Sequence, residues 1–409
     1  MVERLRVKDI IMETGTPTYI YSTQSFANQL NQLRLALGNL PALLCYSVKG
    51  CHNINIIHYF IKQQCGVDIV SGGELYKALQ AGANPQKIVY SGVGKTDREI
   101  REAIQAQILM FNVESEAELE RINAIGAAME QRVPIALRVN PSVDAKTHPY
   151  ITTGLTENKF GIESDKALAV FLKAAQLSHV EVIGVDCHIG SQLLDITPFS
   201  AAVKVLAGLV GTLRHAGIPI RYVDVGGGLG ITYTKEHNPV SVGDYIGLIT
   251  EPFQSFNDLT FIFEPGRFLT AQAGILVTQV QYVKENSYGK RFVIVDTGMH
   301  HLIRPALYGG EHQIIQVTRN HSRPSPVDVV GPICESTDFL RKNYPLEKVA
   351  QDELLAVTDC GAYGIVLASH YNSHPLPVEV MVWGDRFKLI RTRETYQDLC
   401  RNEVWNRNV

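Results

Sequence analysis

The sequence predicts an α/β protein in which a (β/α)8 TIM-type barrel is combined with a C-terminal all-β domain that also includes the N-terminal strand. Between residue 41 and about residue 265, eight short apolar runs rich in β-branched residues alternate with helical patterns, as expected of parallel strands covered on both faces. After residue 270, strand-like runs are separated by Gly, Pro, Asn and Ser turns. A doubly wound open sheet is the alternative for the first part, but only the barrel requires eight units.

The predicted barrel strands are followed by segments with helix signals. The strands are expected at residues 42–48, 66–70, 87–91, 108–113, 135–139, 182–188, 222–225 and 260–264. Thr96 precedes Glu99, and Ser115 precedes Glu118, by three residues, which is the capping-box pattern of a helix start. Apolar residues recur at helical spacing in three of the segments: Leu75, Ala78 and Leu79; Ile100, Ala103 and Ile104; and Leu168, Phe171 and Leu172.

The all-β domain is expected from a second group of strand-like runs. They lie at residues 275–283, 291–296, 313–317, 327–330, 354–359 and 378–382, and the early run 17–21 is placed with them. We therefore predict a barrel domain over 25–272, and a β-sandwich or β-barrel domain over 1–24 and 273–409. The segment 140–161 is long, polar and punctuated by Gly and Pro, so we interpret it as a lid or an interface element.

The composition excludes several classes of protein. Of the 409 residues, 45% are hydrophobic and 19% are charged, with a net charge of -3; this argues against a disordered chain and against non-specific nucleic-acid binding. No signal-type segment and no apolar run long enough to span a bilayer is found. The seven cysteines form no CxxC pair, so we expect reduced thiols, no metal site and a soluble cytoplasmic protein.

Chemically capable residues stand at nearly every predicted strand end, where barrel enzymes carry their catalytic groups. They are Lys49, Asp68, Ser91-Gly92, Asn112, Arg138, His188, Gly226-Gly227-Gly228 and Glu264. Lys49 would reach the barrel mouth, where an unprotonated amine can form a Schiff base. Asp68 could hold that amine in place. A solvated lysine is the ordinary alternative.

The other strand ends suggest what binds there. Glycines at 226–228 let backbone N–H groups approach a phosphate, although such a run can also be only a tight turn. Glu264 is a carboxylate that needs a partner if it is buried, and a pyridinium N–H would serve. The ring of His188 could stack on an aromatic cofactor, or it could be a core histidine. A lysine for an aldehyde, glycines for a phosphate and a carboxylate for a ring nitrogen describe a pyridoxal 5'-phosphate site.

In its sequence motifs the chain resembles the fold-type III pyridoxal phosphate-dependent decarboxylases, and within them the diaminopimelate decarboxylase group. The similarity runs from about residue 17 to residue 382. Its anchors are Tyr46-Ser47-Val48-Lys49, Asp68-Ile69-Val70-Ser71-Gly72-Gly73-Glu74-Leu75, His188-Ile189-Gly190-Ser191-Gln192, Gly226-Gly227-Gly228, Glu264-Pro265-Gly266-Arg267, Arg304-Pro305-Ala306-Leu307-Tyr308, Gly331-Pro332-Ile333-Cys334-Glu335-Ser336 and Gly361-Ala362-Tyr363-Gly364.

The resemblance implies a role for each site residue. Lys49, Cys334, His188 and Glu264 would be catalytic, with Lys49 carrying the cofactor and Cys334 donating a proton. The implied cofactor-binding residues are Lys49, Asp68, His188, Ser191, Gly227, Gly228, Glu264, Pro265, Gly266, Arg267 and Tyr363. The implied substrate-binding residues are Arg267, Arg304, Tyr308, Glu335 and Tyr363. By themselves, Cys334 would be taken as a buried hydrophobe, Arg304 as a surface cation and Tyr363 as a core residue.

The implied activity is decarboxylation of meso-2,6-diaminopimelate to L-lysine and CO2, the last step of lysine biosynthesis, by a homodimer whose subunits share active sites. The small-molecule amino acid would be the substrate, with no nucleic acid and no membrane as partner. A decarboxylase of ornithine, lysine or a related polyamine precursor is the alternative enzyme, and a non-catalytic regulatory relative is the alternative from another class. His300-His301 depart from the pattern of the family close to Arg304.

Overall fold

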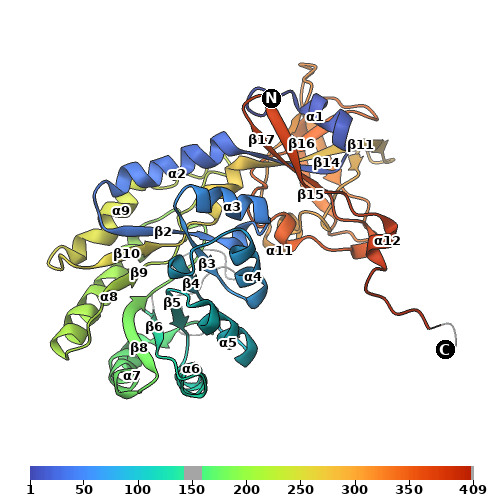
Figure 1. The fold of residues 1–409 in the computed structure, drawn as a ribbon. Coiled ribbons are helices and arrows are strands. Elements are labelled where there is room, and N and C mark those ends of the chain that lie inside the picture. Colours follow the sequence, from blue (N-terminus) through green and yellow to red (C-terminus); the bar gives the residue numbers. More distant parts are fainter. Residues whose placement is uncertain (142–158, 407–409) are drawn as a thin grey trace. The chain divides into compact units, whose positions relative to one another are not determined.

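The chain folds into two compact units. The computed structural model describes residues 1–141 and 159–406, and Figure 1 shows the fold. The barrel unit comprises Leu30–Thr232 and Glu236–Phe268, and the β unit comprises Met1–Gln29, Tyr233–Lys235 and Leu269–Val409. The functions assigned to the predicted domains, cofactor binding for 25–272 and an interface for the rest, stay predictions.

A closed parallel barrel forms the centre of the first unit. Within the described residues its strands follow the order β5-β4-β3-β2-β10-β9-β8-β6, and pairing of β5 with β6 closes the ring. The strands are β2 (Ala42–Ser47), β3 (Gly66–Ile69), β4 (Ile88–Tyr90), β5 (Met110–Val113), β6 (Val133–Asn140), β8 (Val180–Asp186), β9 (Tyr222–Asp224) and β10 (Thr260–Phe263); a short β7 (Ile162–Glu163) pairs with β6. The predicted (β/α)8 barrel is confirmed.

Helices follow the barrel strands and surround them (Figure 1). α2 (Thr23–Leu37) precedes the first barrel strand. The helices that follow the strands are α3 (Ile54–Lys62), α4 (Gly72–Gln80), α5 (Asp97–Ala106), α6 (Glu116–Ala128), α7 (Ser164–Gln176), α8 (Thr197–His215), α9 (Val242–Thr250) and the short α10 (Arg267–Thr270). The capping box of Thr96 and Glu99 is present. Ser115 caps α6 as expected, but the Glu118 carboxylate accepts from the backbone of Glu114 rather than from the cap residue. The helices cover the outside of the barrel, and because all of its strands are parallel, their carboxyl ends lie at one rim.

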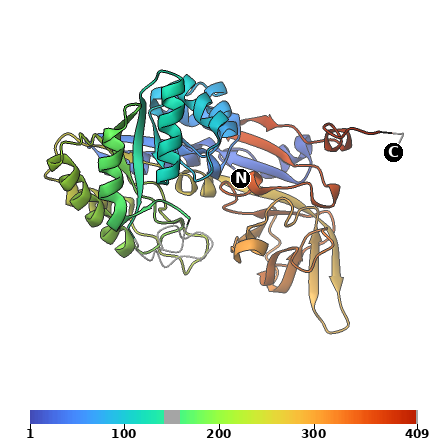
Figure 2. The same ribbon diagram turned by 90° about the horizontal axis from the view of Figure 1, so that it is seen from below.

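The β unit is built on a mixed sheet. The described strands are ordered β15-β14-β12-β11-β1-β17-β18, and β16 pairs with β11 and β13. They are β1 (Thr18–Ser22), β11 (Gly274–Glu285), β12 (Arg291–Val295), β13 (Ile314–Gln316), β14 (Ser325–Val330), β15 (Phe339–Leu346), β16 (Leu354–Val357), β17 (Val378–Trp383) and β18 (Arg386–Arg391). β1 lies between β11 and β17, so the early strand belongs to this sheet, as predicted. Figure 2 shows β11 and β12 as a long hairpin.

Short helices complete the β unit: α1 (Val7–Thr14), α11 (Arg304–Tyr308) and α12 (Tyr396–Leu399). Val7 and Ile10 of α1 pack into a core cluster with Ile20, Val277 and Val380 from three neighbouring strands. This cluster explains why an N-terminal segment can be part of a domain that is otherwise C-terminal.

Most of the segment 140–161, which we predicted to be a lid or an interface element, lies outside the described residues. In the part of the chain that the structure covers, every helix is too short or too polar to cross a bilayer.

Candidate active site

The predicted aldehyde-binding lysine lies at the end of the first barrel strand. A short 3-10 turn (Val48–Gly50) follows β2 and carries Lys49, whose side chain is 34% exposed. Its amine forms an ion pair with Asp68 at the end of β3, and the same carboxylate oxygen accepts a hydrogen bond from Ser47 Oγ at 2.6 Å. The other oxygen, Oδ1, is buried without a hydrogen-bond partner among the described residues. The structure therefore brings Lys49 and Asp68 together as predicted.

A group of buried acids lies inside the barrel around Glu264. Burial raises the pKa of Glu264 well above its usual value, and the nearby Asp224 and Asp68 raise it further. Burial, followed by Asp224, likewise raises the pKa of Asp186. Glu264 Oε1 is buried and has no hydrogen-bond partner in the described structure. A buried carboxylate oxygen without a partner suits a cationic N–H donor, such as a protonated pyridine nitrogen.

The glycine turn after β9 has no room for side chains. Gly226 and Gly228 have positive φ angles of 65° and 104°. A Cβ on Gly227 would lie 2.3 Å from the carbonyl oxygen of Glu264. Backbone therefore packs directly against backbone here, in the close approach that a phosphate-binding turn requires.

His188 lies against this turn. Its Nδ1 accepts a hydrogen bond from the backbone N–H of Gly227 at 3.2 Å, which places the ring hydrogen on Nε2. Burial lowers the pKa of His188 well below its usual value, with smaller contributions from Arg138 and Lys49. The ring is therefore neutral at physiological pH, and a neutral imidazole is suited to stack on an electron-poor aromatic ring.

Arg267 supplies the positive charge at the same rim. It is 7% exposed and donates from Nε and Nη2 to Ser191 Oγ at 3.1 and 2.9 Å. The preceding residues Pro265 and Gly266 contact Ser47: its backbone N–H donates to the Pro265 carbonyl at 3.3 Å, and a Cβ on Gly266 would lie 3.1 Å from its Cβ. Together these barrel residues fit a cofactor with an aldehyde, a ring nitrogen and a phosphate.

The predicted substrate-binding arginine is buried in the β unit. Arg304 begins α11, is 6% exposed and lies over the ring of Tyr233, with 4.5 Å between the guanidinium carbon and the ring centroid. Its Nη1 lies 2.7 Å from Nε2 of His312. Tyr308, at the end of the same helix, is half-buried. This burial argues against reading Arg304 as a surface cation.

The predicted proton donor lies in an exposed loop of the β unit. The thiol of Cys334 donates to Oδ1 of Asn372 at 3.4 Å, and the same oxygen accepts from the Cys334 backbone N–H at 3.3 Å. Glu335 accepts hydrogen bonds from Tyr371 and from Thr337, and these lower the pKa of its carboxyl. Glu335 is therefore ionised at neutral pH, as a binding group for an ammonium must be.

Tyr363 lies in a turn of the β unit and has a left-handed φ of 55°. The neighbouring Gly361 approaches Thr270 so closely that a Cβ there would lie 1.9 Å from the Thr270 carbonyl oxygen. Tyr363 is half-buried rather than in the core, so the residue is not the core tyrosine that its sequence context alone would suggest.

The two adjacent histidines are part of the core. His301 bonds Thr297 Oγ1 and the Pro375 carbonyl at 3.1 Å each. The His300 ring stands 3.7 Å from His301 and 4.7 Å from His374, centroid to centroid, and both of its nitrogens are buried without hydrogen-bond partners among the described residues. Burial lowers the pKa of His300 to about 3, and His374 contributes.

This buried histidine predicts a loss of stability in mild acid. The unfolded chain binds a proton below a pH of about 6.5, whereas the folded chain does so only near 3, so the free energy of unfolding falls as the pH falls through this window. At pH 5.5 the loss from His300 is about 1.4 kcal/mol relative to pH 7.5. Thermal unfolding of His300→Asn should show a smaller decrease between these pH values than the wild type. The exposed His215→Asn is the control, and equal pH dependence of all three proteins would contradict the assignment.

Several residues of these clusters were missed in the sequence analysis. Asp186 and Asp224 are charged residues inside otherwise apolar strand runs, and this signal could have found them. Asn112, which was noted as a strand end, donates to Asp224 Oδ2 at 3.0 Å and so joins the same group. His312 and Asn372 gave no local signal, because their partners are distant in sequence.

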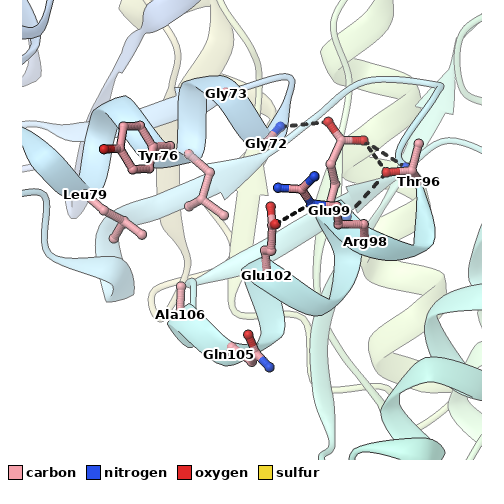
Figure 3. A pocket seen from close by; sticks show the side chains of 11 residues that line it. Gly72, Gly73, Tyr76, Leu79, Thr96, Arg98, Glu99, Glu102, Gln105 and Ala106 are labelled. Atoms are coloured by element: carbon pink, nitrogen blue, oxygen red, sulfur yellow. Dashed lines mark hydrogen bonds and ion pairs between the residues drawn. The ribbon is translucent and has the colours of Figure 1, made fainter.

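A cavity of about 830 Å³ lies between α4 and α5, on the helices outside the barrel (Figure 3). Its charged groups are already paired: Glu99 accepts from the Gly72 backbone N–H at 2.8 Å, and Arg98 bonds Glu102 at 2.7 Å. No predicted site residue lines it. The cavity is therefore separate from the groups that could carry chemistry.

Comparisons with known proteins agree with the kind of site that the barrel residues form. Residues 23–271 match the model of the pyridoxal-dependent decarboxylase family, pyridoxal binding domain. Diaminopimelate decarboxylase of Pseudomonas aeruginosa is 47% identical over 98% of this chain and 96% of its own length. A crystal structure of diaminopimelate decarboxylase from Helicobacter pylori complexed with L-lysine has a TM-score of 0.93 at 41% identity, covering 97% of this chain and 98% of that one. A lysine/ornithine decarboxylase from Vibrio vulnificus, with a TM-score of 0.80 over 92% of this chain and 97% of that one, is 21% identical and shows the fold alone.

Proposed function

Because the chain belongs to the pyridoxal-dependent decarboxylases, and within them to the diaminopimelate decarboxylases, we propose that it removes CO2 from the D-centre of meso-2,6-diaminopimelate and releases L-lysine. The observation that carries this proposal is the identity of 47% over nearly the whole chain with a diaminopimelate decarboxylase. The bound L-lysine in the relative from Helicobacter pylori is the product expected of this reaction. The enzyme is a carboxy-lyase, and this step would complete lysine biosynthesis.

Pyridoxal 5'-phosphate is the cofactor of this family, and the barrel residues fit it. Lys49 would hold its aldehyde carbon, Asp68 would orient the lysine amine, and His188 would lie against the ring. The Gly227-Gly228 turn, Ser191, Arg267 and, from the β unit, Tyr363 would surround the phosphate. When bound, the cofactor supplies an electron sink, because its protonated ring accepts the electron pair left by the departing CO2.

Glu264 would hold the proton on the ring nitrogen. Its Oε1 has no partner among the described residues and is surrounded by acids that make an isolated negative charge costly. A cationic N–H facing this oxygen would offset that cost. Asp224 accepts from the Gly226 backbone N–H at 2.9 Å and lies close enough to Glu264 to raise the pKa of its carboxyl. It therefore couples the acid to the glycine turn.

The distal end of the substrate is a second amino-acid head, which carries both a carboxylate and an ammonium. We assign the carboxylate to Arg304 and Tyr308 and the ammonium to the ionised Glu335. A bidentate guanidinium–carboxylate pair is selective for this task. Removing one partner of a buried ion pair costs roughly 3–5 kcal/mol, so a substrate without the distal carboxylate should react at least about a hundredfold less efficiently.

Cys334 would donate the proton that replaces CO2. The Asn372 oxygen accepts a hydrogen bond from the thiol and so fixes its orientation. We propose that Cys334 and Glu335 act on a cofactor held by the barrel of a second copy, so that the active unit is a homodimer. Their position in an exposed loop supports this arrangement.

We also propose a cytoplasmic location, in which the seven free thiols would stay reduced.

The test is a comparison of CO2 release from meso-diaminopimelate, ornithine and lysine by the same holoenzyme preparation. We expect kcat/KM for meso-diaminopimelate to exceed both others by at least about a hundredfold. A preference for ornithine or lysine would establish the polyamine-type alternative instead. Bound cofactor without release of CO2 from any of the three would favour a regulatory relative.

A further inference from the structure

His312 holds the buried guanidinium of Arg304 in the β unit. His312 is fully buried, and its two ring nitrogens have different partners. Nε2 lies 2.7 Å from Arg304 Nη1, and Nδ1 lies 2.8 Å from the Thr358 carbonyl oxygen. The imidazole thus lies between a cation and a backbone acceptor.

These contacts determine the protonation state of the ring. A guanidinium only donates hydrogen bonds, so Nε2 must accept, and a carbonyl oxygen only accepts, so Nδ1 must carry the hydrogen. A doubly protonated ring would turn an N–H toward the guanidinium and place two positive charges in contact. The geometry therefore requires a neutral imidazole with its hydrogen on Nδ1.

Tyr233 completes the support of the arginine. The guanidinium of Arg304 lies over the Tyr233 ring at 4.5 Å, and the His312 ring meets the same tyrosine edge-on, with 5.4 Å between centroids. The face of the guanidinium is fixed by Tyr233 and one of its nitrogens by His312. A planar group held in this way has a defined orientation before any anion arrives, which lowers the entropy lost on binding.

We propose that His312 is a positioning residue for substrate selection, which acts by orienting Arg304 toward the carboxylate of the amino-acid centre that does not react. This inference rests on the proposed function, because it takes the ligand of Arg304 to be that carboxylate. His312 itself does not touch the substrate. Its loss should weaken binding of ligands that carry the carboxylate and leave unaffected those that lack it.

L-lysine and cadaverine are the matched probes, since they differ only in this carboxylate. Their dissociation constants for the holoenzyme can be measured by isothermal titration calorimetry, which does not depend on turnover. In His312→Leu, L-lysine should bind about tenfold or more weakly, while cadaverine should change less than about twofold. In His312→Gln, the amide oxygen can accept in the place of Nε2, so most of the L-lysine affinity should return. The exposed His215→Leu is the control for loss of a histidine.

A second binding experiment uses the Arg304→Ala variant. In that background His312→Leu should cause no further loss of L-lysine binding, because the group that His312 orients is gone. If His312→Leu does not fold, His312→Asn replaces it, since the shorter amide cannot reach the position of Nε2. Asn should then weaken L-lysine binding and Gln should not.

Equal weakening of L-lysine and cadaverine, or undiminished L-lysine binding in His312→Leu and His312→Asn, would overturn the positioning role. These outcomes are separate from failure of the proposed function, which would appear as absence of CO2 release from meso-diaminopimelate by the wild type. In steady-state kinetics, the positioning role predicts a rise in KM for meso-diaminopimelate that exceeds the change in kcat.

Discussion

Replacing Lys49 with alanine is expected to lower the rate of CO2 release from meso-diaminopimelate by at least about a thousandfold, because the variant lacks the amine that attaches the cofactor. The ion pair with Asp68 shows that the amine is held at the strand end and is not a freely solvated lysine. Radiometric or manometric measurement of CO2 release by cofactor-loaded protein checks this result.

Two control variants separate the chemistry of Lys49 from its charge. Lys49→Arg keeps a cation beside Asp68 but has no nucleophilic amine at neutral pH, so it should be as inactive as Lys49→Ala. Lys62→Ala, at the exposed end of α3, should retain wild-type activity. Substantial turnover by Lys49→Ala would exclude Lys49 as the residue that carries the cofactor.

Mixing inactive Lys49→Ala with inactive Cys334→Ala is expected to restore activity. In a hybrid dimer with shared sites, one site combines both substitutions and the other contains neither. Random re-association of equal amounts gives hybrids as half of the dimers, so the recovered activity should approach about a quarter of the wild-type value. The activity is measured after the subunits have been dissociated and re-associated together.

The control for this recovery is a mixture of Lys49→Ala with Lys49→Arg. Both substitutions affect the same half of every site, so this mixture should stay inactive. No recovery with Cys334→Ala, in samples shown by mass analysis to contain hybrid dimers, would mean that each site is completed within a single chain.

The barrel could be predicted because its strands carry a strong local signal. All eight apolar runs became parallel strands, and their ends shifted by no more than a few residues. The buried face of α7 was harder to predict: Leu172 is 41% exposed, whereas Ala167, Val170, Phe171 and Ala174 are buried. Small alanines on the covered face and leucines near the surface weaken the hydrophobic periodicity there.

Strands β15 and β18 were missed because their own residues do not show a buried strand. β15 contains Arg341, Lys342 and a proline, and β18 alternates basic with apolar residues near the edge of the sheet. Such strands form because a neighbour offers hydrogen bonds, in these cases β14 and β17. Pairing of this kind depends on the fold and not on the composition of the segment.

The residues of the site likewise include some that could be predicted from the sequence and others whose contacts could not. Lys49 and Asp68 could be predicted from their positions at strand ends, since the barrel geometry alone brings those ends together. The partnership of Arg304 with His312 and Tyr233 could not, because it depends on side-chain packing between segments that share no pattern. The Asn372 contact of Cys334 likewise requires a left-handed residue 38 positions away.

Whether the amine of Lys49 carries the cofactor can be tested by reducing the holoenzyme with borohydride, followed by proteolysis and mass spectrometry of the peptides. We expect a pyridoxyl phosphate adduct on the peptide that contains Lys49, together with loss of the absorbance of the bound cofactor. An adduct on a different lysine, or a coloured protein that borohydride leaves unlabelled, would contradict the claim that the amine at the end of β2 carries the cofactor.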